Sequence, residues 1–444
     1  MFERILIANR GEVATRVARS CRRIGVETVG VHVTADASAI HVAACDESVS
    51  LGDDPSGYLD GEAILAAARD RGVHAIHPGY GLLAEDPAFA RAVAEAGLLF
   101  VGPDADTLTR VRDRLAVRAA AIECGVRVLP GSERPITGPQ HALVDVDRID
   151  YPVVVRPRLG IGETQGAVAN DVAELAEALA ALDPLEDHGG AFVETHIERA
   201  RHVEIQLFST EGLALVLGDR EVSLRRGQRR LFAESPAAAL EQLRTVDAVR
   251  GAMWEAASEV AQKLEVSGLC SAHFVLDFDG LFYLAGFTPG LQVEHTTIEM
   301  CSNIDLVEMQ LRFAAGEPLA DELSKVEPSG CALQAYVDAA CDPATGRAFE
   351  SHVQAARWPP APPGKVRIET GIQMGSLVSP TLDPLVASIT TYAPNRHDAL
   401  LMLDRILAEI HLSPLVTNQR LLRKALNHES FRAGQFDEGF VDRI

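Results

Sequence analysis

Lysine is scarce in this sequence. Only four of its 444 residues are lysine, and the first of them is Lys263, so arginine supplies the other 37 of the 41 basic residues. The 63 acidic residues outnumber the basic ones and give a formal net charge of −22 at pH 7. Because binding to the phosphates of a nucleic acid needs clustered cations in surplus, this balance argues against nucleic acid as the main partner.

Paired cysteines and long apolar runs are also missing. The seven cysteines include no C-x-x-C pair, and a chain of this size does not need disulfides for stability. The first residues lack the basic segment and the long apolar segment of a signal peptide, and no uncharged stretch approaches the roughly 18 residues of a membrane span. We therefore expect a cytoplasmic protein that is neither exported nor membrane-spanning.

Hydrophobic residues make up 47% of the sequence, which is enough for a large core and for two or three domains. In the N-terminal part, short apolar strand patterns alternate with amphipathic helices. Residues 5–8 predict a strand, and Val13, Val17, Cys21 and Ile24 lie on one face of the helix that follows. This alternation predicts an open parallel sheet.

The pattern changes at about Pro130 to a small α+β unit, which is typical of a lid. Further along, Asp279-Gly280 predicts the turn of a β-hairpin. The predicted elements are strand 153–155, helix 172–182, strand 192–194 and the hairpin strands 272–278 and 281–285.

Several short motifs occur in a fixed order along the chain. They are Ile7-Ala8-Asn9-Arg10-Gly11-Glu12, His77-Pro78-Gly79-Tyr80-Gly81, Val101-Gly102-Pro103, Arg201-His202-Val203-Glu204-Ile205-Gln206, Gln292-Val293-Glu294-His295 and Thr417-Asn418. Such an ordered set is far more specific than any one of its members. With these motifs, the chain resembles the biotin carboxylase subunit of biotin-dependent carboxylases over roughly residues 1–440.

The resemblance implies an α/β ATP-grasp fold in three parts. An N-terminal domain with an open parallel sheet would cover residues 1–112, an ATP-grasp region 113–320 with a small α+β lid at about 130–197, and a C-terminal mixed α+β domain 328–440. The family uses MgATP and bicarbonate to make carboxyphosphate and then carboxylates biotin on a carrier protein. The biotin-attachment sequence Ala-Met-Lys-Met does not occur here, so any carrier is a separate chain.

The phosphate-binding positions keep their charge but not their residue type. The resemblance places Arg114 and Arg156 where the family has two lysines, and it places Glu194 and His202 near the nucleotide. Arginine retains the positive charge, but its rigid planar fork is not equivalent to an ammonium group at a packed phosphate site. A general preference for arginine over lysine and a selected change explain this exchange equally well.

The lid loop differs more. The family's run of consecutive glycines is replaced by residues 157–166, which keep Gly160, Gly162 and Gly166 but include Glu163. Side chains would hold the backbone away from phosphates, and a carboxylate would repel them. We expect a degenerate ATP site that no longer grips phosphate.

The magnesium-binding positions have lost their ligands. Two carboxylates and one asparagine of the family align with Val275, Gly286 and Thr288, none of which replaces a carboxylate. Asp277 lies on the same predicted strand face as Val275, ~6–7 Å further along, and is either a shifted ligand or an ordinary polar residue at the strand end. We expect no metal site.

The bicarbonate segment is retained in part. Gln292, Val293 and Glu294 match it, with Glu294 at the position of the general base, but Gly290 and Tyr336 stand where the family has active-site arginines. Without those arginines the charge that develops in the reaction has no obvious source of stabilisation. We expect the retained residues to persist because they pack or form hydrogen bonds, and we assign no catalytic residue.

The resemblance also bears on the dimer interface of the family. Arg19 and Arg367 match polar positions of that interface, whereas Arg23 and Gly364 replace an acid and an aromatic ring. Two arginines on one helix face would repel across an isologous contact. A heteromeric partner that carries acids is therefore favoured over the homodimer.

Taken together, these features predict a non-catalytic biotin-carboxylase-like subunit that scaffolds or regulates an acyl-CoA carboxylase-type complex. Its expected partners are active biotin carboxylase, biotin carrier or carboxyltransferase chains, with no nucleic acid and no membrane. No cofactor is expected, and ATP and Mg²⁺ only if residual function is retained. Two alternatives stay open: an active ATP-grasp ligase with an altered active site, and a nucleotide or bicarbonate sensor.

Overall fold

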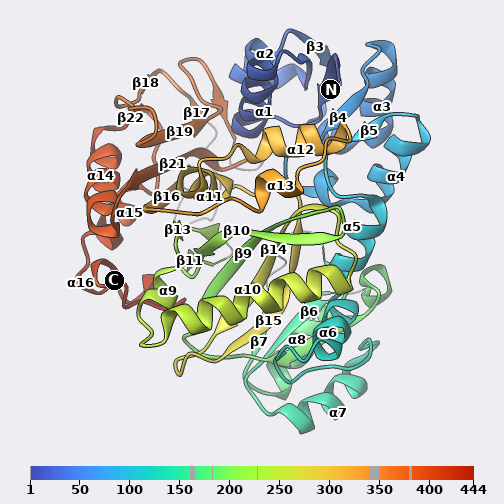
Figure 1. Ribbon diagram of the computed structural model, residues 1–444, viewed down its shortest axis with the longest axis vertical. Helices are drawn as coiled ribbons and strands as arrows, with labels where there is room; N and C mark the ends of the chain where they lie inside the picture. Colours follow the sequence, from blue (N-terminus) through green and yellow to red (C-terminus); the bar gives the residue numbers. More distant parts are fainter. Residues whose placement is uncertain (1, 161–165, 183, 228, 340–350, 380–382) are drawn as a thin grey trace.

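A computed structural model describes residues 2–444 apart from 161–165, 183, 228, 340–350 and 380–382. Figure 1 shows an N-terminal sheet, a small lid and a large sheet that carries most of the remaining strands. One apolar cluster contains both Val17 of the N-terminal part and Phe208 of the large sheet. The two sheets therefore share a core, and this fixes the N-terminal part against the large sheet.

The N-terminal sheet is parallel and has the strand order β3-β2-β1-β4-β5. Its strands and helices are β1 (Arg4–Ile7), α1 (Gly11–Ile24), β2 (Glu27–His32), α2 (Ile40–Ala44), β3 (Glu47–Ser50), α3 (Gly61–Asp70), β4 (Ala75–His77), α4 (Pro87–Glu95) and β5 (Leu99–Phe100). The predicted helix face is confirmed, because Val13, Val17 and Cys21 of α1 are buried.

Two of the sequence motifs meet at the carboxyl edge of this sheet. The side-chain amide of Asn9 donates to the carbonyl oxygens of Pro78 and Tyr80, both at 2.7 Å. Gly79 has a φ of +67°, and a β-carbon there would lie 2.8 Å from Asn9 Nδ2. Only glycine fits this approach without strain, so the motif has a packing reason.

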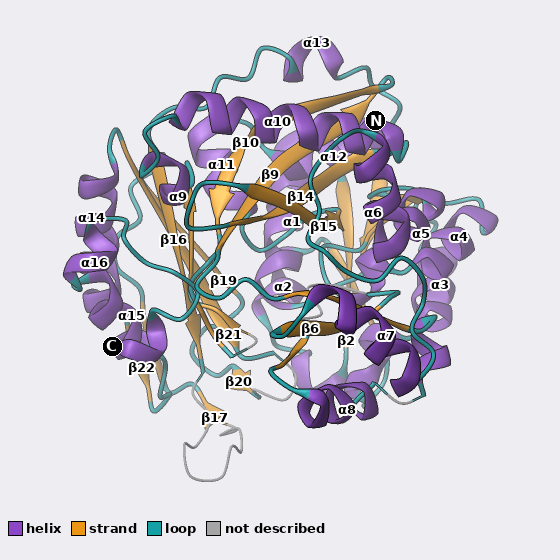
Figure 2. Ribbon diagram, turned by 90° about the horizontal axis from the view of Figure 1, so that it is seen from below, coloured by secondary structure: helices purple, strands orange, loops and turns teal. Residues whose placement is uncertain are grey.

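The lid is a three-stranded antiparallel sheet with two helices, joined to the N-terminal part by α5 (Ala105–Arg112) and α6 (Arg114–Glu123). Its elements are α7 (Pro139–Ile149), β6 (Val153–Pro157), β7 (Ala167–Ala169), α8 (Val172–Ala180) and β8 (Ala191–Thr195). Figures 1 and 2 both show α7, α8 and β6 gathered into one unit at the edge of the molecule. Its core includes Val153, Val193 and Leu175, each at most 1% exposed.

The large sheet has eight antiparallel strands in the order β15-β14-β9-β10-β13-β16-β21-β19. They are β9 (Arg201–Thr210), β10 (Leu213–Glu221), β13 (Phe232–Ser235), β14 (Gly268–Leu276), β15 (Phe282–Pro289), β16 (Cys331–Asp338), β19 (Val366–Thr370) and β21 (Leu385–Ala393). Helix α10 (Val246–Lys263) packs its apolar face on β9 and β10, and α14 (Arg396–Glu409) packs on β16 and β21.

The remaining elements connect and cover these layers. They are β11 (Arg225–Arg226), β12 (Arg229–Arg230), α9 (Ala238–Glu241), α11 (His295–Ser302), α12 (Leu306–Ala314), α13 (Ala320–Leu323), β17 (Ser351–His352), β18 (Ala355–Arg357), β20 (Leu377–Val378), β22 (His411–Ser413), α15 (Gln419–Leu426) and α16 (Glu429–Arg432). Within the part of the chain that the structure describes, no helix is long and apolar enough to cross a membrane.

One predicted strand is too long. Strand β14 ends at Leu276, two residues before the predicted end, because Asp277 belongs to the turn. Its Oδ1 accepts hydrogen bonds from the backbone N–H groups of Asp279 and Leu281, both at 2.9 Å. Asp277 is therefore a turn residue, and the alternative of a shifted metal ligand on the strand is wrong.

Candidate functional site

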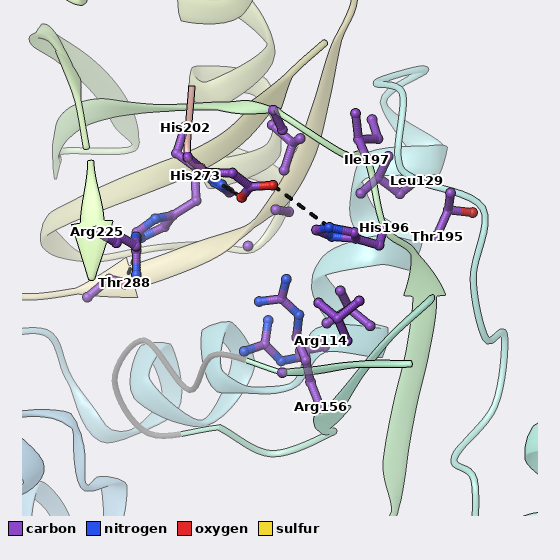
Figure 3. A pocket seen from close by; sticks show the side chains of 18 of the residues that line it. Arg114, Leu129, Arg156, Thr195, His196, Ile197, His202, Arg225, His273 and Thr288 are labelled. Atoms are coloured by element: carbon purple, nitrogen blue, oxygen red, sulfur yellow. Dashed lines mark hydrogen bonds and ion pairs between the residues drawn. The ribbon is translucent and has the colours of Figure 1, made fainter. Parts of the chain in front are cut away.

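A cleft of about 210 Å³ lies between the lid and the large sheet. Figure 3 shows side chains from both parts converging on it, with Arg114 and Arg156 on one side and His202 and His273 on the other. The lining residues come from α6, β6, β7, β8, β9, β11, β14, β15 and the C-terminal segment. Elements that are distant in the sequence therefore build one site.

The residues expected at the nucleotide phosphates do meet in this cleft. Arg114 is the first residue of α6, and its Nε donates to the carbonyl oxygen of Pro157 at 3.2 Å. Arg156 lies on β6, where its Nε is 3.2 Å from Glu194 Oε1. Burial, with a smaller contribution from Arg156, lowers the pKa of Arg114 to about 10. Two guanidinium groups thus face the cleft with one carboxylate beside them.

The lid loop is described only at its ends. Gly162 and Glu163 lie outside the described residues, whereas Gly160 borders a small hollow with Arg114 and Gly286. A β-carbon on Gly166 would lie 2.2 Å from Val154 Cγ1 and 2.5 Å from the carbonyl oxygen of Val155. Close packing against β6 therefore requires glycine at position 166.

Thr288, at one of the family's metal-ligand positions, belongs to a hydrogen-bonded pair. His273 lies opposite Gly286 across β14 and β15, and its Nε2 is 2.7 Å from Thr288 Oγ1. Its Nδ1 is 3.0 Å from Glu204 Oε1. Burial lowers the pKa of His273, so the ring is neutral at pH 7, with its proton on the nitrogen that faces the carboxylate. Nε2 then accepts a hydrogen bond from the Thr288 hydroxyl.

The side chain of Val275, which the resemblance aligned with a magnesium ligand of the family, does not contact the pair of His273 and Thr288 described above. It pairs with Tyr283 and packs with Leu129 and Ala200 in a small apolar cluster, while His273 is the side chain that faces Gly286 and Thr288. An imidazole and a hydroxyl that hydrogen-bond to each other do not offer Mg²⁺ the hard anionic oxygens that it prefers. Among the described residues, no group of three or more histidine, cysteine, aspartate or glutamate side chains is placed to hold a metal ion.

The retained bicarbonate segment lies next to the cleft, inside a buried ion-pair network. Gln292 accepts a hydrogen bond from the guanidinium of Arg220, a residue on β10 that is fully buried. Arg220 also donates to Glu204 and Gln206, each at 2.7 Å, and to Ser271 at 2.9 Å. Gln292 therefore serves as one of four neighbours that solvate a buried arginine.

Glu294 is held in the same network. Its Oε1 accepts from the Tyr336 hydroxyl at 2.5 Å and lies 2.7 Å from Arg230 Nη1. Burial raises the pKa of Glu294, but Arg230, Arg220 and the hydrogen bond from Tyr336 together outweigh this effect and keep it below the ordinary value of a glutamate. The backbone carbonyl of the intervening Val293 accepts from Gln334 at 2.9 Å. All three retained residues thus have hydrogen-bond partners within the protein.

Several residues of the site were missed from the sequence. Arg220 hydrogen-bonds Gln292, and Arg230 pairs with Glu294, so both arginines bring positive charge to the retained segment. Glu204 joins both arginines to His273. The charged run Asp219-Arg220-Glu221, which follows the apolar residues of the strand Leu213–Glu221, was the available signal, because such charges must be paired when buried.

The C-terminal segment also reaches the cleft. Glu438 Oε2 is 3.0 Å from His202 Nε2, and Glu438 Oε1 is 3.8 Å from His196 Nε2. Asp437 pairs with Arg199, and the Arg201 guanidinium lies 4.1 Å from the centroid of the Phe436 ring. A carboxylate from the end of the chain therefore lines the cleft beside His202.

The expected repulsion between Arg19 and Arg23 does not arise within the chain. Arg19 pairs with Glu369 at 2.5 Å, and Arg23 pairs with Asp305 at 2.8 Å and with Glu308. Both arginines are thus matched by acids of β19 and of the start of α12. The two arginines are therefore already neutralised within the chain, and the preference for a heteromeric partner over the homodimer stays a prediction.

Comparison with protein-family models divides the chain into three matched segments. Residues 1–108 match the N-terminal domain of biotin carboxylase, residues 113–322 the ATP-binding domain of the carbamoyl-phosphate synthase L chain, and residues 338–443 the C-terminal domain of biotin carboxylase.

Curated relatives span the whole chain. The biotin carboxylase of Halalkalibacterium halodurans is 32% identical over 449 residues, which cover 99% of this chain and 97% of that protein. The mitochondrial methylcrotonoyl-CoA carboxylase subunit alpha of Glycine max is 34% identical over 99% of this chain, but the chain spans only 60% of that longer subunit.

A solved structure agrees with these matches. The biotin carboxylase–β-γ-ATP complex from Campylobacter jejuni superposes with a TM-score of 0.92 at 26% sequence identity, covering 100% of this chain and 99% of that one. A lid set over a cleft at the edge of a large antiparallel sheet defines an ATP-grasp architecture, as expected. Within that class, the chain belongs to the biotin carboxylase family.

Proposed function

We propose that this chain is a non-catalytic member of the biotin carboxylase family that acts as a structural or regulatory subunit of an acyl-CoA carboxylase-type complex. Its domains would be the N-terminal domain over residues 1–112, the ATP-grasp region over 113–320 with the lid at about 130–197, and the C-terminal domain over 328–440. Its partners would be active biotin carboxylase, biotin carrier or carboxyltransferase chains, assembled in the cytoplasm.

One observation carries the proposal. Where the resemblance places the magnesium ligands, Thr288 hydrogen-bonds a neutral His273 and Gly286 has no side chain. Activation of ATP needs a divalent cation that bridges the phosphates, and the enzyme's part is to hold it with oxygen ligands. These residues do not fit that ion, so the step that forms carboxyphosphate has no metal.

Two further positions support the proposal. Gly290 has a φ of +80°, in the left-handed region that favours glycine, so an arginine side chain would be strained there. Tyr336 gives Glu294 a neutral hydrogen bond where the family has a cation. Both oxygen contacts of Glu294 that are described here, with Tyr336 and Arg230, lie inside the protein.

A second candidate is an active ATP-grasp ligase with altered chemistry. The cations at Arg114 and Arg156, and the position of Glu294 beside Arg230, favour it. The two functions differ in one assay, because only the ligase would hydrolyse ATP in a bicarbonate-dependent manner.

The subunit role is tested in the native host. Affinity capture of the tagged chain should recover biotin-containing or carboxyltransferase chains, and deletion of the gene should lower the carboxylase activity of the complex. A Glu294→Gln variant, checked for intact assembly by gel filtration, should restore that activity to the level given by the wild-type chain and by the surface control Arg405→Gln. An assembled Glu294→Gln complex without activity would show that Glu294 acts as a base.

A further inference from the structure

The turn between β14 and β15 carries a phenylalanine that the fold leaves in solvent. Phe278 is 98% exposed, more than any other large hydrophobic side chain of the described residues. Leu281 of the same turn is 42% exposed, and Leu243 lies against the turn, because a β-carbon on Gly280 would be 3.2 Å from Leu243 Cδ2. Single exposed leucines are normal in soluble proteins, but a fully exposed aromatic ring with further apolar side chains at the same turn is typical of a contact surface.

Hydrogen bonds fix the turn that presents this ring. Asp277 Oδ1 accepts from the backbone N–H groups of Asp279 and Leu281, and the backbone N–H of Asp277 donates to the carbonyl oxygen of Leu281 at 2.9 Å. Gly280 supplies the left-handed conformation that closes the turn, with a φ of +82°. The position of Phe278 is therefore set before any partner binds, and this lowers the entropic cost of docking.

An open groove of about 660 Å³ lies between the end of β18 and the end of α14. Trp358 packs partly against the apolar cluster that contains Leu403 and Leu407 of α14, and this contact holds one wall of the groove in place. Tryptophan and proline offer the apolar surface on which an aromatic ring packs well. The groove is lined by Arg357, Trp358, Pro359, Pro360, Ala408 and Glu409.

The charges of the turn and of the groove are complementary. Asp279, next to Phe278, is exposed and forms no ion pair with any described residue. Arg357 is exposed as well, and its guanidinium forms no ion pair with any described residue. Glu409, the acid of the groove, is paired with Arg405 at 3.1 Å. The charge that is left for a partner is thus negative beside Phe278 and positive beside Trp358.

We propose that Phe278 of one copy of this chain docks in the groove beside Trp358 of a second copy, with Asp279 next to Arg357. Figure 1 shows β18 and β22 at the upper left, well apart from β15, so the turn does not reach the groove of its own chain. The contact therefore joins two copies head to tail.

This contact is separate from the family's dimer interface and from the subunit role proposed above. It uses neither α1 nor β19, which carry Arg19 and Arg367. A single side chain in a groove buries much less than the roughly 1,200 Å² of a stable interface. We therefore expect weak association that depends on the protein concentration.

Sedimentation equilibrium of the full chain, from micromolar to submillimolar concentration, tests the contact. The weight-average mass should rise above the 47.7 kDa of one chain. Phe278→Ser should weaken the association by about tenfold or more, whereas the control Leu213→Ser, at the turn between β9 and β10 and 49% exposed, should stay within about threefold of wild type. A mass that stays at 47.7 kDa, or an association that Phe278→Ser leaves unchanged, would overturn the proposal.

Charge reversal identifies the two sides of the contact. Asp279→Arg and Arg357→Asp should each weaken self-association by about fivefold or more, because each brings like charges together. An equimolar mixture of the two variants should associate within about threefold of wild type, since the turn of each variant then matches the groove of the other. Melting temperatures show whether both variants are folded. A mixture that associates no better than either folded variant alone would contradict the proposal.

Discussion

The cleft and the network around Glu294 lie side by side on one sheet, but their charges are arranged in opposite ways. In the network, the buried Arg220 and Arg230 are matched by Glu204 and Glu294. In the cleft, the described part of the lining places Arg114, Arg156 and Arg225 around an open space of about 210 Å³, together with Glu438. Gln292 and Glu294 thus have buried partners, whereas Val275, Gly286 and Thr288 border the open space.

This difference bears on how to interpret the residues that this chain shares with the catalytic motif of the family. Gln292 and Glu294 match a catalytic motif, yet each is explained by a buried partner that would be costly to leave unpaired. Retention of a catalytic residue type therefore does not by itself indicate catalysis. The predictions below separate the two regions, from the largest expected effect to the smallest.

Removing Arg220 should have the largest effect on stability. The Arg220→Ala variant leaves Glu204 and Gln292 buried without their main partner, and breaking a buried charge pair costs about 3–5 kcal/mol. Urea unfolding monitored by circular dichroism measures the loss. The exposed Arg405→Ala variant, whose pair with Glu409 lies on the surface, should lose at most about 0.5 kcal/mol. A loss below about 1 kcal/mol for Arg220→Ala would show that the network is not an integral part of the fold.

Deleting one hydroxyl in each region gives a finer comparison. Tyr336→Phe removes a hydrogen bond to the carboxylate of Glu294 and should cost about 1.5–3 kcal/mol, because bonds to charged groups are stronger. Thr288→Val removes a bond to the neutral ring of His273 and should cost about 0.5–1.5 kcal/mol. Both losses can be measured by urea unfolding at pH 7.5. A larger cost at Thr288 than at Tyr336 would contradict the assignment of a neutral histidine.

Acidification should destabilise the network around Glu294 and the adjacent His295. Burial, opposed mainly by the negative charge of Glu299, lowers the pKa of His295 to about 4, so stability is lost as the pH falls below the unfolded value near 6.5. The pKa of Glu204 is lowered to about 2 by Arg220 and His273 against the effect of burial, so its contribution is lost below about pH 4.5. Each titrating group adds a slope of at most about 1.4 kcal/mol per pH unit. Buried acids oppose this trend, since burial raises the pKa of Asp338 to about 7, so the effect of His295 is measured against a His295→Gln variant. Between pH 7.5 and 4.5 the wild type should lose unfolding free energy relative to that variant, and no relative loss would refute the neutral state of His295.

MgATP should have the smallest effect. A ligand stabilises the folded state only by RT ln(1 + [L]/Kd), so a site without metal ligands should shift the melting temperature by less than about 1 °C at millimolar MgATP. Differential scanning fluorimetry in parallel with a catalytic biotin carboxylase gives the positive control. A shift of several degrees would show that the lid and Arg114 still hold the metal–nucleotide complex.

The sequence predicted the fold, and which residues line the cleft, better than it predicted the contacts between their side chains. Alternating strand and helix patterns placed the N-terminal parallel sheet, and the ordered motifs placed Arg114, Arg156 and His202 in one cleft. Side-chain partners between distant strands could not be predicted in the same way, because the register of β14 against β15, with its irregularity after His273, decides that His273 and not Val275 faces Thr288. For the same reason, the acids that match Arg19 and Arg23 were visible only in the folded chain.

Bicarbonate-dependent ATP hydrolysis tests the central claim most directly. Phosphate release is measured with MgATP, bicarbonate and free biotin or a biotinylated carrier, at enzyme concentrations high enough to detect less than one turnover per hour. Because the residues around His273 and Gly286 do not fit a metal ion, we expect no release above the rate without protein. Turnover of about one per second, ordinary for an enzyme, would show that the chain is a catalytic carboxylase subunit and would contradict the account.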